Sequence, residues 1–345
     1  MGVSLKDIAE RAGVSLATVS NVVNGYRPVG ERTRQRVQQA IDELGYSPNL
    51  SARHLRRGRT GLIALAIPEL NNPYFAELAE IAIREAAGLG YTLVMENTAA
   101  DREAELLLLD GSRRHIIDGL IFSPVRIGRE EVLARTADNP LVLIGEGVHD
   151  VPHDHIAIDN VAASRAAIQH LVSIGRRRIA FLGATSGGDR QSAHLRMRGY
   201  REALAAAGLP YRPQLVVPTD AFGRVDGRRA MRDLLTLGEL PDAVFGYNDL
   251  IAVGALRALT EAGHRVPETV AVIGIDDIEE GRFSSPTLTT IAPDKEAIAR
   301  LAVRRLVARI EGTEVAAPLT VQTPFQLIRR ESTMSGVTDA DRPDR

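Results

Sequence analysis

The densest group of side chains that could do chemistry lies between positions 149 and 155. It consists of His149, Asp150, His153, Asp154 and His155. Imidazole nitrogens and carboxylate oxygens are ligands that Zn²⁺ accepts. However, the segment contains Pro152, joins two predicted strands, and has no second group of ligands at a matching spacing. We therefore expect a solvated loop here, and we predict neither a metal site nor a cofactor.

Two further patterns that serve catalysis in other proteins are incomplete in this chain. The segment from Gly183 to Gly188 (GATSGG) is rich in glycine, but it lacks the GK[ST] that completes a phosphate-binding loop. The chain contains no GxSxG nucleophile elbow and no persuasive Ser–His–Asp arrangement. The residues therefore do not predict an enzyme.

The composition excludes several other classes of protein. The 345-residue chain has no cysteine, which rules out disulfides, iron–sulfur clusters and cysteine nucleophiles. No apolar run approaches the length of about 18 residues that a membrane-spanning helix needs, and an acidic residue occurs as early as Asp7, which is unlike a secretory signal. With 44% hydrophobic and 25% charged residues, the chain can form the cores of two or three domains. We expect a cytoplasmic protein.

The charge is unevenly distributed, although the net charge of the chain is only -2. Residues 1–60 contain ten arginines and lysines against five acidic residues, a net charge of +5, which leaves -7 on the other 285 residues. A small basic region attached to an acidic body is the electrostatic pattern of a protein that binds a polyanion such as DNA.

The basic region predicts three short helices. Apolar residues recur at helical spacing between Ser4, which can cap a helix, and Gly13, which ends it. Ser15 can cap a second helix with valines at 19, 22 and 23 on one face, and a third helix is expected over 31–44. Two short helices joined by a turn that contains a glycine form a helix-turn-helix, whose core a third helix closes.

From residue 60 onward, short apolar runs alternate with helical patterns. Candidate strands are 62–67, 92–96, 119–123, 141–145, 156–159, 179–183, 215–217, 243–246, 270–275 and 288–292. Candidate helices are 75–89, 162–174, 195–207, 250–262 and 296–311. This alternation predicts an α/β body with two doubly wound parallel sheets. Residues 335–345 lack apolar periodicity and are expected to form a disordered tail.

Specific motifs make the chain resemble the LacI/GalR family of transcription regulators. In the basic region they are VSLKDIAERAGVSLATVSNVVNG and TRQRVQQAIDELGYSPNLSARHLRRGRTG. In the body they are IPELNNPYF, HLVSIGRRRIAFLG, RMRGYREAL, YNDLIAVGALRAL, VIGIDD and LTTI. The resemblance covers nearly the whole chain. It implies a helix-turn-helix domain (1–47), a hinge (48–60) and an effector-binding and dimerisation domain of the periplasmic-binding-protein type (61–334).

The resemblance implies that the second helix enters the major groove of DNA, which admits one helix. The base-facing side chains would be Leu16, Ala17, Ser20 and Asn21. Asn21 can pair with adenine, whereas the apolar pair can touch thymine methyl groups. Contacts with phosphates are expected from Ser4, Thr18, Arg32 and Arg34. For each Ser or Thr, a helix cap or a solvated face is the alternative.

The family's second DNA element is a hinge helix in the minor groove, which follows a YxPN signature that here is Tyr46, Pro48 and Asn49. Its expected DNA contacts are Asn49, Ala52, Leu55, Arg56 and Arg57. Ala52 permits close approach, Leu55 can wedge between base pairs, and the arginines face phosphates. A segment this short and charged is expected to fold only on DNA. A flexible linker that merely tethers the first domain is the alternative.

The resemblance also implies a ligand between two subdomains, at the carboxyl ends of their strands. We expect an N-subdomain of about 61–159 plus 290–317 and a C-subdomain of about 160–289 plus 318–334. The expected effector contacts are Asn72, Tyr74, Phe75, Asp159, Arg196, Phe222, Asn248 and Asp276. These side chains suit a polyol, so a sugar-like effector is favoured, although an arginine could equally meet a carboxylate or phosphate. Structural roles stay open for Asn72 as a helix cap, Arg196 as the partner of an acid and Asp276 in a turn.

The sequence therefore predicts a ligand-responsive transcription regulator, and a repressor that binds a near-palindromic operator as a homodimer is favoured. The expected dimer face is the helix at 250–262, whose apolar residues spread around much of its surface, together with 75–89. A solute-binding protein would need a secretory signal and no basic region, and a sugar enzyme would need a catalytic group. An activator stays open, because the polarity of control depends on the position of the operator. The tail has no leucine heptads, so no tetramer is expected.

Overall fold

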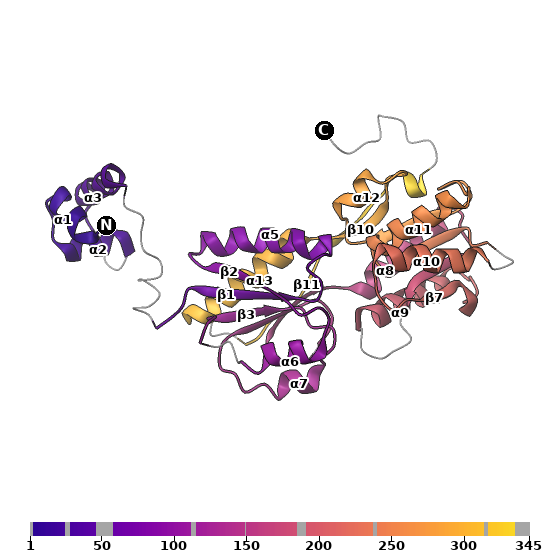
Figure 1. The fold of residues 1–345 in the computed structure, drawn as a ribbon, viewed down its shortest axis with the longest axis horizontal. Helices are drawn as coiled ribbons and strands as arrows, with labels where there is room; N and C mark the ends of the chain where they lie inside the picture. The colour runs from indigo at the N-terminus through magenta and orange to yellow at the C-terminus, as the bar shows by residue number, and fades with distance from the viewer. Residues whose placement is uncertain are drawn as a thin grey trace. The chain divides into compact units, whose positions relative to one another are not determined.

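The structure, a computed structural model, describes residues 3–24, 28–45, 58–111, 115–148, 150–184, 191–236, 240–313 and 317–334. The chain divides into two compact units, Met1–Gly61 and Leu62–Arg345. The expected hinge contacts Asn49, Ala52, Leu55, Arg56 and Arg57 lie outside the described residues, as do most of the GATSGG segment and the tail from 335 to 345. The expected fold class is confirmed: a helical first unit precedes two parallel α/β sheets (Figure 1).

In its described residues, the first unit contains three helices, α1 (Leu5–Ala12), α2 (Leu16–Asn24) and α3 (Glu31–Leu44). Ser4 and Asp7 form a capping box, because Asp7 N–H donates to Ser4 Oγ at 3.4 Å and Ser4 N–H donates to Asp7 Oδ2 at 2.8 Å. Gly13 ends α1 in the left-handed region, with φ of 60°. Ile8, Val19 and Val37 are fully buried between the helices. The predicted helix-turn-helix is confirmed.

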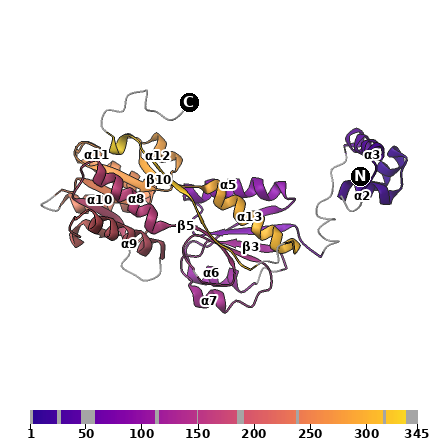
Figure 2. The same ribbon diagram turned by 180° about the vertical axis from the view of Figure 1, so that it is seen from behind.

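The second unit begins with a parallel sheet of strand order β2-β1-β3-β4-β5-β11. Its strands are β1 (Leu62–Ile67), β2 (Thr92–Asn97), β3 (Gly119–Phe122), β4 (Leu141–Ile144), β5 (Asp154–Ile158) and β11 (Thr320–Thr323). Helices α5 (Pro73–Gly88) and α13 (Lys295–Glu311) cover one face, and α6 (Arg102–Leu109) and α7 (Arg129–Leu133) cover the other, as Figures 1 and 2 show. Because alternate residues of a strand face opposite sides, Ile63 and Leu65 pack towards α5, whereas Ala64 packs towards α6.

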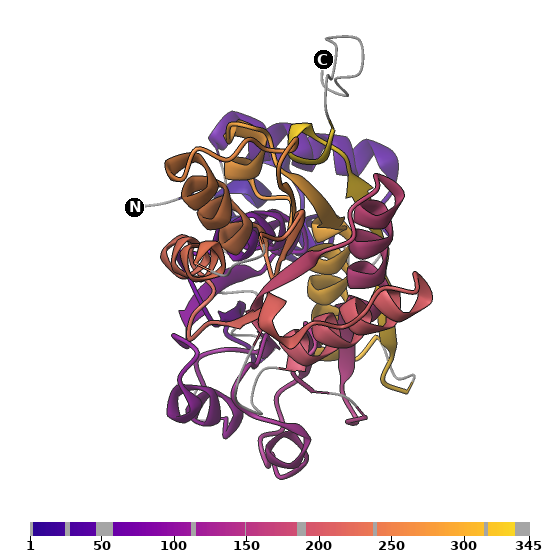
Figure 3. The ribbon, with the colours of Figure 1, turned by 90° about the vertical axis from the view of Figure 1, so that its right-hand side faces the viewer.

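The second sheet has the order β7-β6-β8-β9-β10-β12, in which β12 is antiparallel to β10. Its strands are β6 (Ile179–Ala184), β7 (Val216–Pro218), β8 (Ala243–Gly246), β9 (Ala271–Ile275), β10 (Thr289–Pro293) and β12 (Phe325–Ile328). Helices α8 (Asn160–Ser173) and α9 (Gln191–Ala206) lie on one face, and α10 (Arg224–Leu235) and α11 (Asp249–Glu261) on the other (Figure 3). The short α12 (Glu279–Phe283) follows β9.

Over the described residues, the chain passes between the two sheets three times, and two of these crossings differ from the expected boundaries. Strand β10 pairs in the second sheet, although residues from 290 on were expected in the N-subdomain. Strand β11 pairs with β5 in the first sheet, although residues from 318 on were expected in the C-subdomain. The crossings therefore lie next to residues 294 and 324. The edge strand β11 (TVQT) is largely polar, which explains why no apolar run indicated it.

The apolar residues of α11 pack inside their own subdomain. Their spread around the helix suggested a dimer face, but this packing accounts for it without an interface. Ile251, Leu256 and Leu259 are buried between α10 and the sheet. The two helices approach closely at Gly227 and Gly254, where an added Cβ would lie 2.1 to 2.2 Å from the other helix's backbone.

Among the helices of the described ranges, none is long and apolar enough to cross a membrane.

Candidate ligand-binding and DNA-binding sites

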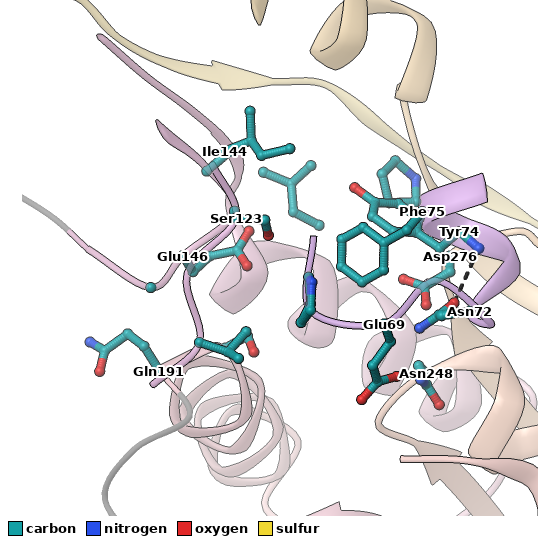
Figure 4. Close-up of a pocket in the computed structure, with 18 of the residues that line it drawn as sticks. Glu69, Asn72, Tyr74, Phe75, Ser123, Ile144, Glu146, Gln191, Asn248 and Asp276 are labelled. Atoms are coloured by element: carbon teal, nitrogen blue, oxygen red, sulfur yellow. Dashed lines mark hydrogen bonds between the residues drawn. The ribbon is translucent and has the colours of Figure 1, made fainter. Parts of the chain in front are cut away.

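A cavity in the second unit lies where the carboxyl ends of strands from both sheets converge (Figure 4). From the first sheet it is lined by residues that follow β1, β3 and β4, such as Glu69, Ser123 and Glu146. From the second sheet it is lined by residues that follow β8 and β9, such as Tyr247 and Asp276. This is the edge at which open α/β sheets bind ligands.

Seven of the eight expected effector contacts line this cavity. They are Asn72, Tyr74, Phe75, Arg196, Phe222, Asn248 and Asp276. The eighth, Asp159, is not among the lining residues; its Oδ1 accepts the N–H of Ala162 at 2.9 Å and caps α8. The expectation for Asp159 is therefore corrected: the carboxylate satisfies a helix end rather than facing the cavity.

Arg196 is a buried cation held by two protein groups. Its Nε donates to Asn160 Oδ1 at 2.6 Å, and its Nη1 donates to the carbonyl of Tyr247. Burial acts to lower the pKa of Arg196, but Tyr247, Asp276 and Glu146 outweigh burial and raise it. The third guanidinium nitrogen, Nη2, has no hydrogen-bond partner among the described residues, so it can donate a hydrogen bond to a ligand.

Aromatic rings and this guanidinium form one wall of the cavity. The rings of Phe222 and Tyr247 stack with centroids 4.0 Å apart and an angle of 23° between their planes. The Arg196 guanidinium carbon lies 4.4 Å from the Tyr247 ring centroid, and Ser192 Oγ lies 2.8 Å from the Tyr247 hydroxyl. Tyr247 was not among the expected residues, although it directly precedes Asn248 in the YND motif.

Asp276 supplies a buried carboxylate at the end of β9. Its φ of 124° is a conformation that a residue other than glycine adopts at an energetic cost, and such costs concentrate at functional sites. Burial raises the pKa of Asp276 to about 7, although Arg196 and Lys295 act to lower it. The described residues provide no hydrogen-bond donor to this carboxylate, so a ligand hydroxyl can take that place.

Glu146 is, beside Asp276, another acidic group of the cavity, and it was missed. It approaches the cavity from a different side than Asp276, as Figure 4 shows. Burial raises the pKa of Glu146, whereas Arg196 and Asn160 act to lower it. It follows β4 by two residues, so the rule that strand ends carry ligand contacts could have identified it.

The two asparagines of the cavity are also helix caps. Asn72 Oδ1 accepts the N–H of Tyr74 at 3.1 Å at the start of α5, which confirms the alternative role that stayed open for it. Asn248 Oδ1 accepts the N–H of Ile251 at 2.9 Å at the start of α11, and its Nδ2 donates to the carbonyl of Phe222 at 3.2 Å. Both side chains therefore fix the helix starts that border the cavity.

The histidine and aspartate segment is structural where the structure describes it. Asp154 is buried and pairs with Arg305 at 2.7 Å and Arg309 at 2.9 Å, and His155 Nε2 contacts the carbonyl of Gly145. The expected solvated loop is therefore wrong for Asp154 and His155, which begin β5; Asp154 holds this strand against α13. His149 lies outside the described residues. Within the described ranges, no group of three or more side chains could hold a metal ion.

In the first unit, the residues expected to face DNA bases share one side of α2. Leu16 is 52% exposed and Ala17 is exposed, so both side chains are accessible to a partner. Ser20 and Asn21, one turn further along, are half-buried, while Val19 points into the core. The fold thus brings the four expected base-facing residues together on a surface that a groove can receive.

The four residues expected to contact phosphates divide into two kinds. Ser4 and Thr18 take part in helix caps, since Thr18 N–H donates to Ser15 Oγ at 3.1 Å and Ser4 belongs to the capping box. Arg32 and Arg34 are exposed in the first turn of α3, where a positive charge is unfavourable for the helix dipole. An anion such as phosphate would remove that unfavourable interaction.

Comparisons with known proteins agree with this arrangement. The family model for bacterial regulatory proteins of the lacI family matches residues 4–49, and that for a periplasmic binding protein-like domain matches residues 168–333. The ribose operon repressor of Escherichia coli (strain K12) is 37% identical over 328 residues, which cover 94% of this chain and 98% of that repressor.

Two solved structures extend the similarity. The complex of the transcriptional regulator CelR with cellobiose is 34% identical, with a TM-score of 0.70 over 96% of this chain and 99% of that one. The lac repressor dimer bound to operator is 28% identical, with a TM-score of 0.77 over 97% of this chain and 100% of that one. The chain therefore belongs to the LacI family of bacterial transcription regulators, with the family's DNA-binding helix-turn-helix and its periplasmic-binding-protein-like domain.

Proposed function

We propose that this protein is a transcriptional repressor that binds operator DNA as a homodimer and responds to a sugar-like molecule in the cavity of the second unit. The observation that carries the proposal is the convergence of Arg196, Asp276 and the Phe222–Tyr247 stack on one cavity. The names of relatives support it, since one is a ribose operon repressor and another was solved with cellobiose. A protein with this role acts in the cytoplasm.

The charges of the cavity favour a neutral polyol over an anion. Asp276, Glu146 and Glu69 provide three carboxyl groups against the single guanidinium of Arg196. This excess of acidic groups repels a phosphate or carboxylate, whereas sugar hydroxyls can donate to carboxylates and accept from an arginine at once. The Phe222 ring lines the cavity and stacks on Tyr247 with one face, so its other face can meet the C–H side of a sugar ring. We therefore favour a neutral sugar over the sugar phosphate that an arginine alone would permit.

The DNA contacts that we propose combine α2 with the hinge. Leu16, Ala17, Ser20 and Asn21 read bases in the major groove, while Arg32 and Arg34 hold phosphates. In segment 48–60, Leu55 enters the minor groove between the two subunits, flanked by Asn49, Ala52, Arg56 and Arg57. The charge of +5 on residues 1–60 makes binding salt-dependent, since each phosphate neutralised contributes about 0.9 to the slope of log K against log salt.

Exposed apolar side chains on α10 and α12 support a homodimer. Val225 is 74% exposed and Phe283 is 80% exposed. An ion pair between Arg224 and Glu280 joins the two helices that carry them. Large exposed apolar residues on neighbouring elements are typical of an interface, so we propose this surface, in place of α11, as part of the dimer face. Phe283→Lys should therefore lower the mass of the protein in light scattering from dimer towards monomer.

A thermal-shift panel tests the effector. D-Ribose, cellobiose, D-glucose and D-galactose are compared with ribose 5-phosphate and glucose 6-phosphate. A sugar present at 100 times its dissociation constant adds about 2.7 kcal/mol to the stability of the protein. Asp276→Asn should remove the response and leave sugar-free operator binding intact, because the carboxylate faces the cavity. Stabilisation by the phosphates alone would contradict the neutral-sugar proposal, and loss of operator binding with a retained sugar response would contradict the choice of cavity.

A further inference from the structure

Lys295, the first residue of α13, makes three polar contacts with a single ammonium group. Its Nζ donates to the carbonyls of Asp276 and Asp277, each at 3.0 Å, and pairs with Glu77 Oε2. The side chain is only 11% exposed. It does not line the cavity, so its contacts are to the protein and not to a bound ligand.

The choice of lysine at this position has a chemical reason. The chain has 42 basic residues, and Lys295 is one of only two lysines among them. An ammonium group has three N–H donors that point in different directions, which match three oxygens, whereas a guanidinium is a planar fork. A cation in the first turn of a helix opposes the helix dipole, so the stability of α13 does not explain this lysine.

The three oxygens belong to both subdomains of the second unit. Glu77 lies on α5, which packs on the first sheet together with α13. Asp276 and Asp277 follow β9 of the second sheet and have φ values of 124° and 51°, both unfavourable for residues other than glycine. Lys295 therefore fixes the backbone of a strained loop of one subdomain to a helix of the other. The carboxylate of Asp276, on the same loop, faces the cavity.

We propose that Lys295 is a positioning residue for effector binding, which holds the loop at Asp276 and Asp277 so that the Asp276 carboxylate is aimed into the cavity. The inference rests on the proposed function, because it assumes that the cavity binds the effector. It goes beyond that function by assigning ligand affinity, and the link between the subdomains, to a residue that touches no ligand. A simpler role, an ion pair with Glu77 that only joins the two subdomains, makes different predictions.

The first experiment measures amide hydrogen exchange of residues 276–278 in the full chain without ligand. These amides donate to Ile291 O, Thr290 Oγ1 and Asp249 Oδ2. Lys295→Met keeps the aliphatic stem, and Lys295→Arg keeps the charge but not the three-way geometry. Both should accelerate exchange at 276–278 by about tenfold, since contacts within one network couple at this scale. Arg300→Met, which removes an exposed charge from the same helix, should not.

The second experiment measures the affinity of these variants for whichever of D-ribose, D-glucose, D-galactose and cellobiose binds the wild-type protein most tightly. Lys295→Met and Lys295→Arg should each lose about tenfold in affinity, while Glu77→Gln and Arg300→Met should lose little. Wild-type affinity in Lys295→Arg would show that the ion pair alone matters and would overturn the proposal. If no sugar binds the wild-type protein, the proposed effector class fails, and unchanged exchange at 276–278 would then overturn the assignment of Lys295 by itself.

Discussion

The two units of the chain present their functional residues in opposite ways. In the first unit, the candidate base contacts Leu16 and Ala17 stand exposed on one side of a single helix. In the second unit, Arg196 and Asp276 are buried and come from different elements, α9 and the end of β9. The first arrangement depends on local sequence, whereas the second depends on how two sheets bring distant segments together.

This difference predicts which substitutions separate function from stability. An exposed side chain on α2 can be replaced with little effect on folding, because its removal leaves no cavity and no unpaired group. A buried charge such as Arg196 stabilises other buried charges, so its removal affects folding and binding together. The following changes test whether the contrast holds, from the largest expected effect to the smallest.

Replacing Arg196 should have the largest effect. Arg196→Met leaves Asp276 and Glu146 without the cation near both of them. It also removes the guanidinium that lies over the Tyr247 ring. Breaking a buried charged pair from one side costs about 3 to 5 kcal/mol, so urea unfolding should show a loss of that size and sugar binding should disappear. Arg198→Met, at an exposed position of the same helix, should leave both unchanged. Full sugar affinity in Arg196→Met would remove the basis for the proposed site.

Acid should destabilise the second unit through His170. Burial, with Arg329 nearby, lowers the pKa of His170 to about 4, and its Nε2 lies 2.8 Å from Thr333 Oγ1. Because the unfolded chain binds this proton near pH 6.5 and the folded chain does not, stability falls as the pH drops from about 6.5 to 4, by about 2 to 3 kcal/mol at pH 4.5. His170→Gln should lose that share of the acid sensitivity in urea titrations at pH 7 and 4.5. An identical pH dependence in both proteins would show that His170 does not carry it.

The same contrast explains how much could be predicted from the sequence. The helices of the first unit follow from local caps and periodicity, and Ser4, Gly13 and the span 31–44 act as predicted. In the second unit, Asp159 and Glu146 each follow a strand, yet one caps α8 and the other lines the cavity. Sequence spacing does not separate these outcomes, because they depend on whether a helix or a neighbouring strand end lies beside the carboxylate.

Two other differences have similar causes. The apolar surface of α11 suggested an interface because α10 was not among the expected helices, although its buried residues Gly227, Ala230, Met231 and Leu234 recur at helical spacing. Lys295 gave no signal beyond its rarity, since its three oxygen partners lie on α5 and at the end of β9, far from it in sequence. Contacts of this kind follow from tertiary structure alone.

A substitution on the exposed side of α2 should have a smaller effect, and this effect should be confined to DNA binding. Asn21→Ala removes a side chain that can pair with one adenine, which is worth about 1 to 3 kcal/mol of discrimination between bases. Fluorescence anisotropy should show weaker operator binding with unchanged non-specific binding, and the unfolding midpoint should stay the same. Gln38→Ala on the exposed side of α3 serves as the control. An equal loss on operator and random DNA would mean that Asn21 contacts the backbone rather than a base.

The smallest expected effect is a change of effector affinity with pH near neutrality. Burial raises the pKa of Asp276 to about 7, so this group changes its charge between pH 6 and 8. A sugar hydroxyl can bond to either form, but a carboxylate is the stronger acceptor, and Arg196 beside it favours the charged form. Affinity should therefore rise from pH 6 to pH 8, by up to about tenfold, since a group with this pKa is mostly neutral at pH 6 and mostly ionised at pH 8.

Calorimetric titration with the best-binding neutral sugar measures this dependence, and Glu146→Gln identifies the group responsible. Glu146 also has a raised pKa, but it approaches the cavity from a different side. If Asp276 is the titrating group, the rise in affinity persists in Glu146→Gln but moves to lower pH, because the burial of Asp276 is unchanged while a negative charge that helps to raise its pKa is lost. If the rise disappears in that variant, Glu146 holds the proton that the ligand displaces. An affinity that falls from pH 6 to pH 8 would mean that the protonated carboxyl donates to the sugar, and the hydrogen bond would then run in the opposite direction.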